Sequence, residues 1–205
     1  MSSVRSTTAL INESGIAFGT SGARGLVEQF SDEVCAAFTI AFISAMQRSF
    51  SFERIAIGLD RRPSSPAMAA ACTSAAKALG IQVDDYGVLP TPALALKAMA
   101  EGIPCIMVTG SHIPFDRNGI KFYRPDGEIS KADETAILMA DVAIPSLPAP
   151  KRNEVSEAAN QAYLERFTTW FAGEPLKGWR VGCCWTRFKR GYIKRTRCRC
   201  SDPGP

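Results

Sequence analysis

Residues 54–109, RIAIGLDRRPSSPAMAAACTSAAKALGIQVDDYGVLPTPALALKAMAEGIPCIMVT, alternate short apolar runs with longer alanine-rich stretches. The runs at residues 54–60, 81–88 and 103–109 have the length and composition of strands. The stretches between them are long enough to be helices. This alternation predicts an α/β fold with a mixed, largely parallel sheet and flanking helices.

Local signals place four helices around these strands. Helices are expected over residues 31–50, 65–80, 91–102 and 130–142. The first and last begin at a serine with acidic residues in the first turn, and the middle two begin with Ser-Pro or Thr-Pro. Asn118-Gly119 is typical of a tight turn and predicts a fourth strand over residues 119–124.

The sequence divides after the last of these helices. Residues 144–150, IPSLPAP, contain three prolines, so we expect a first domain over residues 1–143 and a linker over residues 144–153. Residues 154–182 are interpreted as the start of a second α/β domain, with a helix followed by a strand at GWRVG. This second domain is expected to be incomplete, because nothing after it has a helix or strand rhythm.

Residues 183–205 form a basic, cysteine-rich tail, which we interpret as disordered. Seven basic residues and one acidic residue give this tail a charge of +6, so residues 1–182 carry about −2 of the total +4. A shifted or interrupted reading frame near codon 182 is the favoured hypothesis for the tail. The alternative is a zinc or nucleic-acid-binding appendage, although Cys183-Cys184 and Cys198-x-Cys200 depart from the usual zinc spacing.

The bulk composition indicates a globular protein of the cytoplasm. No apolar run approaches the roughly 20 residues that span a bilayer, and the N-terminus lacks the pattern of a secretory signal. The slightly negative body gives no sign of nucleic-acid binding. Cys35, Cys72 and Cys105 lie in apolar patterns and are expected to be buried thiols.

The segment most suggestive of chemistry is residues 109–121, TGSHIPFDRNGIK. Ser111 follows a predicted strand, and ligands of open α/β sheets bind at the carboxyl ends of strands. Gly110 is expected to leave room beside the hydroxyl for a phosphate. His112, the only histidine, and Lys121 can supply proton-bearing or positive groups there. Taken alone, the Ser-His pair is also compatible with an ordinary exposed loop.

Two further segments carry glycine, hydroxyl and charged residues. Residues 18–25, FGTSGARG, are interpreted as a flexible loop whose N–H groups and Arg24 could hold an anion, or as a glycine-rich turn with a solvated arginine. Residues 58–66, GLDRRPSSP, follow the first strand of the alternation. Here Asp60 and Arg62 are expected to form a buried pair that holds the loop, a structural function.

Together and in this order, the three segments resemble the signatures of the α-D-phosphohexomutase family of phosphomannomutases and phosphoglucomutases. FGTSGARG is similar to FGTSGxRG, GLDRRPSSP to GxDxRxSS, and TGSHIPFDRNGIK to T(A/G)SHxPxxxNGxK. The resemblance covers roughly residues 14–182. It implies the first domain of a phosphohexomutase and the opening of the second.

The resemblance implies a role for each site residue. Ser111 would be the phosphoserine that exchanges phosphate between O1 and O6 of a hexose phosphate through a bisphosphate intermediate. Lys121 and Arg24 would stabilise the reacting phosphate, with Lys121 aiding proton transfer and His112 supporting the loop. The phosphate-binding residues would be Thr20, Ser21, Gly22 and Arg24. Mg²⁺ would bind an oxygen of the phosphate on Ser111.

The expected substrates are mannose 6-phosphate, mannose 1-phosphate and glucose phosphates. The sequence TGSHIP resembles the phosphomannomutase branch of the family. The alternatives are the phosphoglucosamine mutase branch and a non-catalytic phosphosugar-binding domain. The family's metal loop, DGDxDR, is absent from the sequence. Mg²⁺ needs about six oxygen ligands. Magnesium binding is therefore expected to be weak or absent, and this chain is expected to be truncated and inactive alone.

Overall fold

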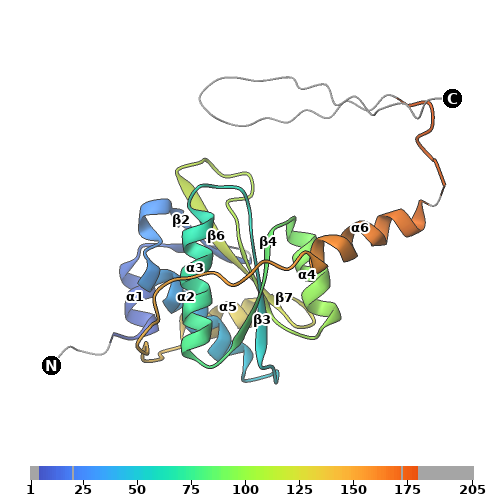
Figure 1. Cartoon of the computed structure of the whole chain (residues 1–205). Coiled ribbons are helices and arrows are strands. Elements are labelled where there is room, and N and C mark those ends of the chain that lie inside the picture. Colours follow the sequence, from blue (N-terminus) through green and yellow to red (C-terminus); the bar gives the residue numbers. More distant parts are fainter. Residues whose placement is uncertain (1–4, 20, 172, 180–205) are drawn as a thin grey trace. The chain divides into compact units, whose positions relative to one another are not determined.

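The computed structural model describes residues 5–19, 21–171 and 173–179 (Figure 1). Contacts divide the chain into two units, residues 1–166 and residues 167–205. The strands are β1 (Ala17–Gly19), β2 (Gly22–Leu26), β3 (Arg54–Leu59), β4 (Gln82–Val88), β5 (Cys105–Val108), β6 (Arg117–Arg124) and β7 (Gly127–Glu128). The helices are α1 (Thr7–Glu13), α2 (Asp32–Met46), α3 (Ser65–Ala78), α4 (Thr91–Ala100), α5 (Lys131–Leu138) and α6 (Ala158–Trp170), with a 3₁₀ turn at Val27–Gln29.

The strands form one mixed sheet in the order β1-β2-β6-β5-β3-β4, with β7 paired to β6. β3 pairs in parallel with both β4 and β5, because α3 and α4 provide the crossovers. The β5/β6, β6/β2, β2/β1 and β6/β7 pairs are antiparallel. The predicted α/β class is confirmed, and the parallel part of the sheet is β5-β3-β4.

The helices begin close to the positions expected from their capping residues. Ser31 accepts a hydrogen bond from the Val34 N–H at the start of α2. Ser130 and Asp133 form the predicted capping box at the start of α5. α2 and α5 both end about four residues before the predicted ends.

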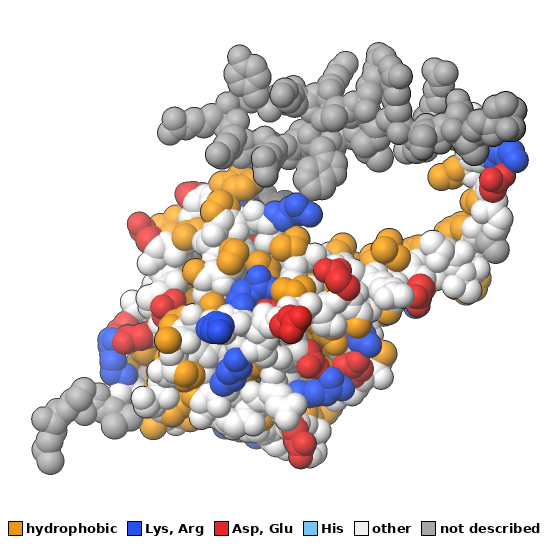
Figure 2. Space-filling model, in the orientation of Figure 1, with side chains coloured by type: hydrophobic (Ala, Val, Ile, Leu, Met, Phe, Trp, Pro, Cys, Tyr) orange, Lys and Arg blue, Asp and Glu red, His pale blue; other side chains and the backbone are white. Residues whose placement is uncertain are grey.

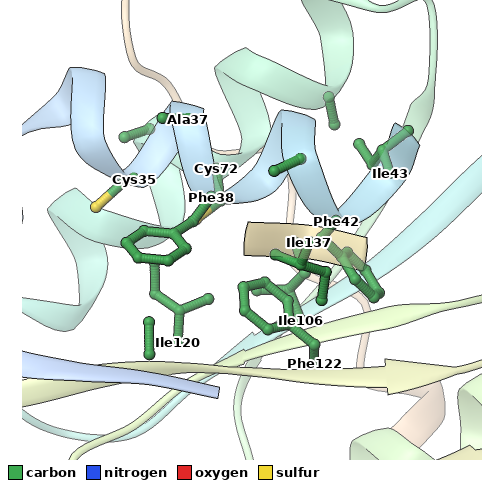
Figure 3. Close-up of a cluster of buried hydrophobic side chains, with 14 of the residues drawn as sticks. Cys35, Ala37, Phe38, Phe42, Ile43, Cys72, Ile106, Ile120, Phe122 and Ile137 are labelled. Carbon is green, nitrogen blue, oxygen red and sulfur yellow. The ribbon is translucent and has the colours of Figure 1, made fainter. Parts of the chain in front are cut away.

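The main core lies between the sheet and the pair α2 and α3, which run side by side in Figure 1. Figure 3 shows Phe42 of α2 above Phe122 of β6, and their ring centroids are 4.7 Å apart. Offset aromatic pairs at this distance add to the hydrophobic gain of burial. α4 covers β3 and β5 on the opposite face, where Leu94 is fully buried. The parallel strands are therefore covered on both faces.

The antiparallel part of the sheet corrects two predictions. Asn118-Gly119 does not form a tight turn, since both residues lie inside β6 and pair with β2. Residues 18–25 are not one flexible loop, because they contribute to β1 and β2. A Cβ on Gly22 would lie 2.1 Å from the carbonyl oxygen of Ile120. The glycine patterns thus mark close strand contacts, which sequence statistics do not distinguish from turns.

Near the start of the first unit, residues 5–7 are hydrogen-bonded to residues 140–144. The Thr7 N–H donates to the Val142 oxygen at 2.9 Å, and the Ile144 N–H donates to the Arg5 oxygen at 3.1 Å. The Thr7 hydroxyl, fully buried, donates to the carbonyl of Ala140. The segment of residues 5–144 therefore begins and ends at the same place.

Residues 144–156, which we call the strap, contain no helix or strand but pack on the first unit. The Ser74 hydroxyl donates to the Pro148 carbonyl, and Asn153 Nδ2 donates to the Val83 carbonyl at 2.6 Å. The Ser156 N–H donates to the carbonyl of Asp85 in β4 at 2.8 Å. The strap covers the edge strand of the sheet, and the proposed domain division at residues 143 and 153 stays a prediction.

α6 begins two residues after the strap, so the helix predicted within residues 154–182 does form. Of the predicted strand at residues 178–182, only residues 178 and 179 are described. The basic tail, residues 183–205, lies outside the described residues, as do the predictions made for it.

The described surface and core agree with the composition. Figure 2 shows basic and acidic side chains interspersed over the visible face. No described helix is long and apolar enough to cross a membrane. Cys35, Cys72 and Cys105 are buried as predicted. Burial raises the pKa of the Cys72 thiol to about 11, so this side chain stays neutral and packs as a small apolar residue.

Candidate active site

Ser111 lies in the loop that follows β5, at the carboxyl end of that strand. It is exposed, and its φ of 49° is the only positive value at a described residue other than glycine. Its N–H donates to Thr109 Oγ1 at 3.0 Å, and its Oγ lies 3.3 Å from His112 Nδ1. Left-handed backbone at an exposed polar residue is frequent in active sites. The position of Ser111 agrees with the sequence prediction.

Asp60, at the end of β3, anchors the start of this loop. Its Oδ2 accepts from the Thr109 hydroxyl and the Gly110 N–H, both at 3.0 Å. Its Oδ1 accepts from the Ser65 hydroxyl at 2.6 Å and from the Arg62 N–H at 2.9 Å. One carboxylate therefore ties the ends of β3 and β5 to the start of α3.

Arg62 holds the rest of the loop. Its Nε lies 3.5 Å from Asp60 Oδ2, so the predicted pair forms, with the Arg62 side chain buried (8% exposed) and the Asp60 side chain partly buried (23% exposed). Its two terminal nitrogens donate to the carbonyls of Ser111, Ile113, Pro114 and Arg117. The loop carbonyls therefore turn toward the guanidinium.

The absence of a side chain at Gly110 leaves room for Arg62, whereas we predicted that it leaves room for a phosphate. A Cβ at Gly110 would lie 2.0 Å from Arg62 Nε and 2.1 Å from Arg62 Cζ. The space left by the missing side chain is thus filled by the guanidinium. Sequence reasoning could not assign this space, because Arg62 is 48 residues away in the chain.

Lys121 and Arg24 face the same side of the sheet. The β2/β6 register pairs Arg24 with Gly119 and Gly22 with Lys121, and residues two apart share a face. The intervening Ile120 is buried in the core under α2, so both cations lie on the other face. In the described chain neither of them forms an ion pair.

These cations lie beside the Ser111 loop. The Thr109 N–H donates to the Gly119 carbonyl at 2.9 Å, so Arg24, Gly119 and Thr109 occupy neighbouring positions across three strands. Neighbouring strands are about 4.8 Å apart, which puts the Arg24 backbone roughly 10 Å from that of Thr109. An arginine or lysine side chain is long enough to cover much of that distance. The structure thus places Arg24 and Lys121 on β2 and β6, the next two strands in the sheet beside β5, whose carboxyl end leads into the loop of Ser111 and His112.

The other predicted phosphate-binding residues are less directly placed. Thr20 lies outside the described residues. Ser21 is buried, and its carbonyl accepts from the Phe122 N–H at 3.1 Å. Gly22 lies in β2, opposite Lys121, where it permits close strand packing. Ser21 and Gly22 both bond or pair with β6 in the sheet, and their contact with phosphate stays a prediction.

Two site residues were missed by the sequence reasoning. Thr109 links Asp60 to the Ser111 N–H through its hydroxyl. Asn118, fully buried, donates from Nδ2 to the hydroxyls of Ser64 and Ser65 at 2.8 and 3.0 Å. Both residues stand in the quoted motifs, so their pattern was visible. Their partners lie in the preceding motif and become evident only when the strands are adjacent.

The described residues do not form a metal site by themselves. No group of three or more His, Cys, Asp or Glu side chains with suitable placement occurs among them. Asp60, the acidic residue next to the Ser111 loop, uses both oxygens as hydrogen-bond acceptors. The residues present do not fit a Mg²⁺ ion, which requires about six oxygens in octahedral geometry.

The fold and the loop define an α/β domain with an exposed serine at the carboxyl edge of its sheet and two cations on adjacent strands. A model described as phosphoglucomutase/phosphomannomutase, alpha/beta/alpha domain I, matches residues 15–143. The chain belongs to the phosphoglucomutase/phosphomannomutase family, a family of phosphohexomutases, which are isomerases.

The similar proteins are named as mutases of two kinds. A phosphomannomutase of Salmonella muenchen is 52% identical over 89% of this chain and 38% of its own length. A phosphomannomutase of Sinorhizobium fredii is 41% identical over 82% and 37%. A phosphoglucosamine mutase of Rhodococcus erythropolis is 34% identical over 82% and 40%. The chain therefore spans about two fifths of the length of these relatives.

Solved structures share the fold. A crystal structure titled putative phosphomannomutase from Thermus thermophilus has a TM-score of 0.64 and 25% identity, over 76% of this chain and 36% of that one. A phosphoglucomutase/phosphomannomutase family protein from Burkholderia thailandensis has a TM-score of 0.59 and 24% identity, over 73% and 34%. The mixed sheet with its flanking helices is thus the family's arrangement.

Proposed function

We propose that Ser111 carries the phosphoryl group that this domain exchanges with a hexose phosphate. The observation that carries the proposal is the position of Ser111: exposed, left-handed, and fixed by Asp60 and Arg62 beside two cations without ion-pair partners in the described chain. Phosphoryl transfer depends chiefly on positioning and on cations that neutralise the phosphate oxygens. The loop positions Ser111, and Arg24 and Lys121 supply the positive charges.

The proposed reaction has two transfers. A sugar hydroxyl attacks the phosphorus on Ser111, its oxygen forms the new O–P bond, and the bond from phosphorus to Ser111 Oγ breaks. The hydroxyl proton passes to Oγ, with Lys121 as the proposed relay and His112 supporting the loop. The reverse transfer from the other end of the hexose 1,6-bisphosphate restores phosphoserine. The phosphate has then moved between O1 and O6.

The proposed substrate is a mannose phosphate, with glucose phosphates as further substrates. The support is that the relatives at 52% and 41% identity are named phosphomannomutases, whereas the phosphoglucosamine mutase named above is 34% identical. Phosphoglucosamine mutase is the second candidate. Magnesium is proposed to contact the phosphate on Ser111, with its remaining ligands supplied from outside the described residues.

The test is incubation of the 205-residue chain with a hexose 1,6-bisphosphate and Mg²⁺, followed by mass spectrometry of the phosphopeptides. We expect one phosphate on Ser111, none after Ser111→Ala, and wild-type labelling after Ser51→Ala, a control at another exposed serine. Phosphate binding without labelling of Ser111 would favour the non-catalytic alternative.

The same sample tests turnover. We expect little conversion of mannose 1-phosphate to mannose 6-phosphate by this chain alone, because turnover needs repeated transfers and the described residues form no metal site beside Ser111. Robust conversion would contradict this part of the proposal.

A further inference from the structure

Arg62 makes more contacts with the Ser111 loop than with its acidic partner. Nη1 donates to the carbonyls of Pro114 and Arg117 at 2.6 and 2.9 Å. Nη2 donates to the carbonyls of Ile113 and Ser111 at 2.5 and 3.5 Å. A single planar group thus bonds four carbonyls of a seven-residue segment. Lysine cannot reproduce this arrangement, because its three donors radiate from one nitrogen.

The guanidinium also has little freedom to move. The Phe115 ring lies over it, with 4.9 Å from Cζ to the ring centroid. On another side, the backbone of Gly110 approaches so closely that a Cβ there would be 2.0 Å from Nε. Arg62 is therefore enclosed by the loop that it holds, and a side chain at residue 110 would displace it.

The inward direction of these carbonyls determines which backbone N–H groups of the loop face solvent. In a trans peptide the C=O and the following N–H point in opposite directions. Since the Ser111 carbonyl points toward Arg62, the His112 N–H points away from it. Among the described residues this N–H has no acceptor. An outward N–H next to Ser111 Oγ is a suitable donor to a phosphate oxygen.

We propose that Arg62 is the positioning residue of this site: it holds the carbonyls of residues 111–117 inward, which fixes Ser111 in its left-handed conformation and directs the His112 N–H toward the phosphate. The inference rests on the proposed function of Ser111 and extends it. Arg62 touches neither the phosphate nor the sugar in this account. Its effect on phosphoryl transfer passes entirely through the loop.

The test compares Arg62→Lys with Arg61→Lys, the same change at the exposed neighbouring position. The rate of Ser111 phosphorylation is measured against the concentration of hexose 1,6-bisphosphate, and hydrogen exchange is measured for residues 110–117. A displacement of about 1 Å can lower a rate about 100-fold. We expect a loss of that order in the maximal rate for Arg62→Lys, with the half-saturating concentration changed less, and faster exchange in the loop.

Gly110→Ala is the second variant, because it keeps the guanidinium and removes only its space. It should reproduce both effects, with circular dichroism showing a folded protein. Wild-type rates or wild-type exchange in folded Arg62→Lys and Gly110→Ala would overturn the inference. If the unmodified chain is not phosphorylated, the proposed function fails, and the exchange comparison alone then decides whether Arg62 orders the loop.

Discussion

The first unit contains two aspartate–arginine pairs, each with one buried side chain, that use their hydrogen bonds differently. Asp85 and Arg152 form a closed pair, in which Nε and Nη2 donate to the two carboxylate oxygens at 2.8 and 2.5 Å. Asp60 and Arg62 form an open pair, whose nearest side-chain atoms are 3.5 Å apart. In the open pair, most donors and acceptors serve neighbouring backbone and hydroxyl groups.

The comparison shows that an aspartate–arginine pair can either fix a segment in place or set the conformation of a loop. The closed pair fixes the strap to β4, and the Asp85 side chain is fully buried there. The open pair distributes its hydrogen bonds over a loop and determines the direction of each peptide. We therefore expect changes at the closed pair to alter stability, and changes at the open pair to alter both stability and phosphoryl transfer.

Arg152→Met should have the largest effect on stability. Removing one partner of a buried ion pair leaves the other charge uncompensated, at a cost of about 3 kcal/mol in the free energy of unfolding. Urea denaturation measures this loss, with Lys151→Met, at an exposed neighbour, as the control. The phosphorylation rate of Ser111 in the folded variant should stay within about twofold of the unmodified chain. A larger fall would mean that the strap also supports the site.

Asp60→Asn should have an intermediate effect on stability and a clear effect on transfer. The change removes the negative charge next to buried Arg62 and turns one of its acceptors into a donor. We expect a loss of about 2 kcal/mol and a phosphorylation rate reduced at least about tenfold. Asp116→Asn, at an exposed aspartate of the same loop, is the control. An unchanged rate would contradict the distinction between open and closed pairs.

The smallest expected effect on stability comes from the left-handed backbone conformation of Ser111. Left-handed conformation costs a residue with a Cβ about 1–2 kcal/mol, and glycine avoids this cost but loses more chain entropy on folding. Ser111→Gly should therefore be more stable than Ser111→Ala by about 0.5–1 kcal/mol in urea denaturation. Neither variant can be phosphorylated at this position. Equal stability would mean that the loop relaxes away from its left-handed conformation without the hydroxyl.

The strand-and-helix pattern of residues 54–109 could be predicted because each element there has its own local signal. The β3-α3-β4-α4-β5 order agrees with the prediction to within a few residues. β1 and β2 were missed since they are short and rich in glycine. β2 pairs with β6, about 100 residues later, and β1 pairs with β2, and no local pattern reports the pairing with β6.

The residues of the candidate site could be predicted from the sequence, but the hydrogen bonds that connect them could not. Ser111, His112, Lys121 and Arg24 were identified from motif residues, and the register puts Arg24 and Lys121 on one face of the sheet, on the next two strands beside the one that precedes Ser111. The four carbonyls bonded to Arg62 could not be foreseen, because backbone directions in a loop depend on its tertiary partners. Gly110 illustrates the limit: its need for space was recognised, but the group that fills the space was not.

The pairing of residues 5–7 with residues 142–144 has a consequence for how this part of the chain can be moved between proteins. The two stretches are hydrogen-bonded neighbours, so the segment that they enclose begins and ends at one point. A domain with adjacent ends can be inserted into a loop of another protein, or reopened elsewhere after its ends are joined, without stretching either chain. The hydrogen bonds around Thr7 thus make residues 5–144 a segment suited to such a transfer.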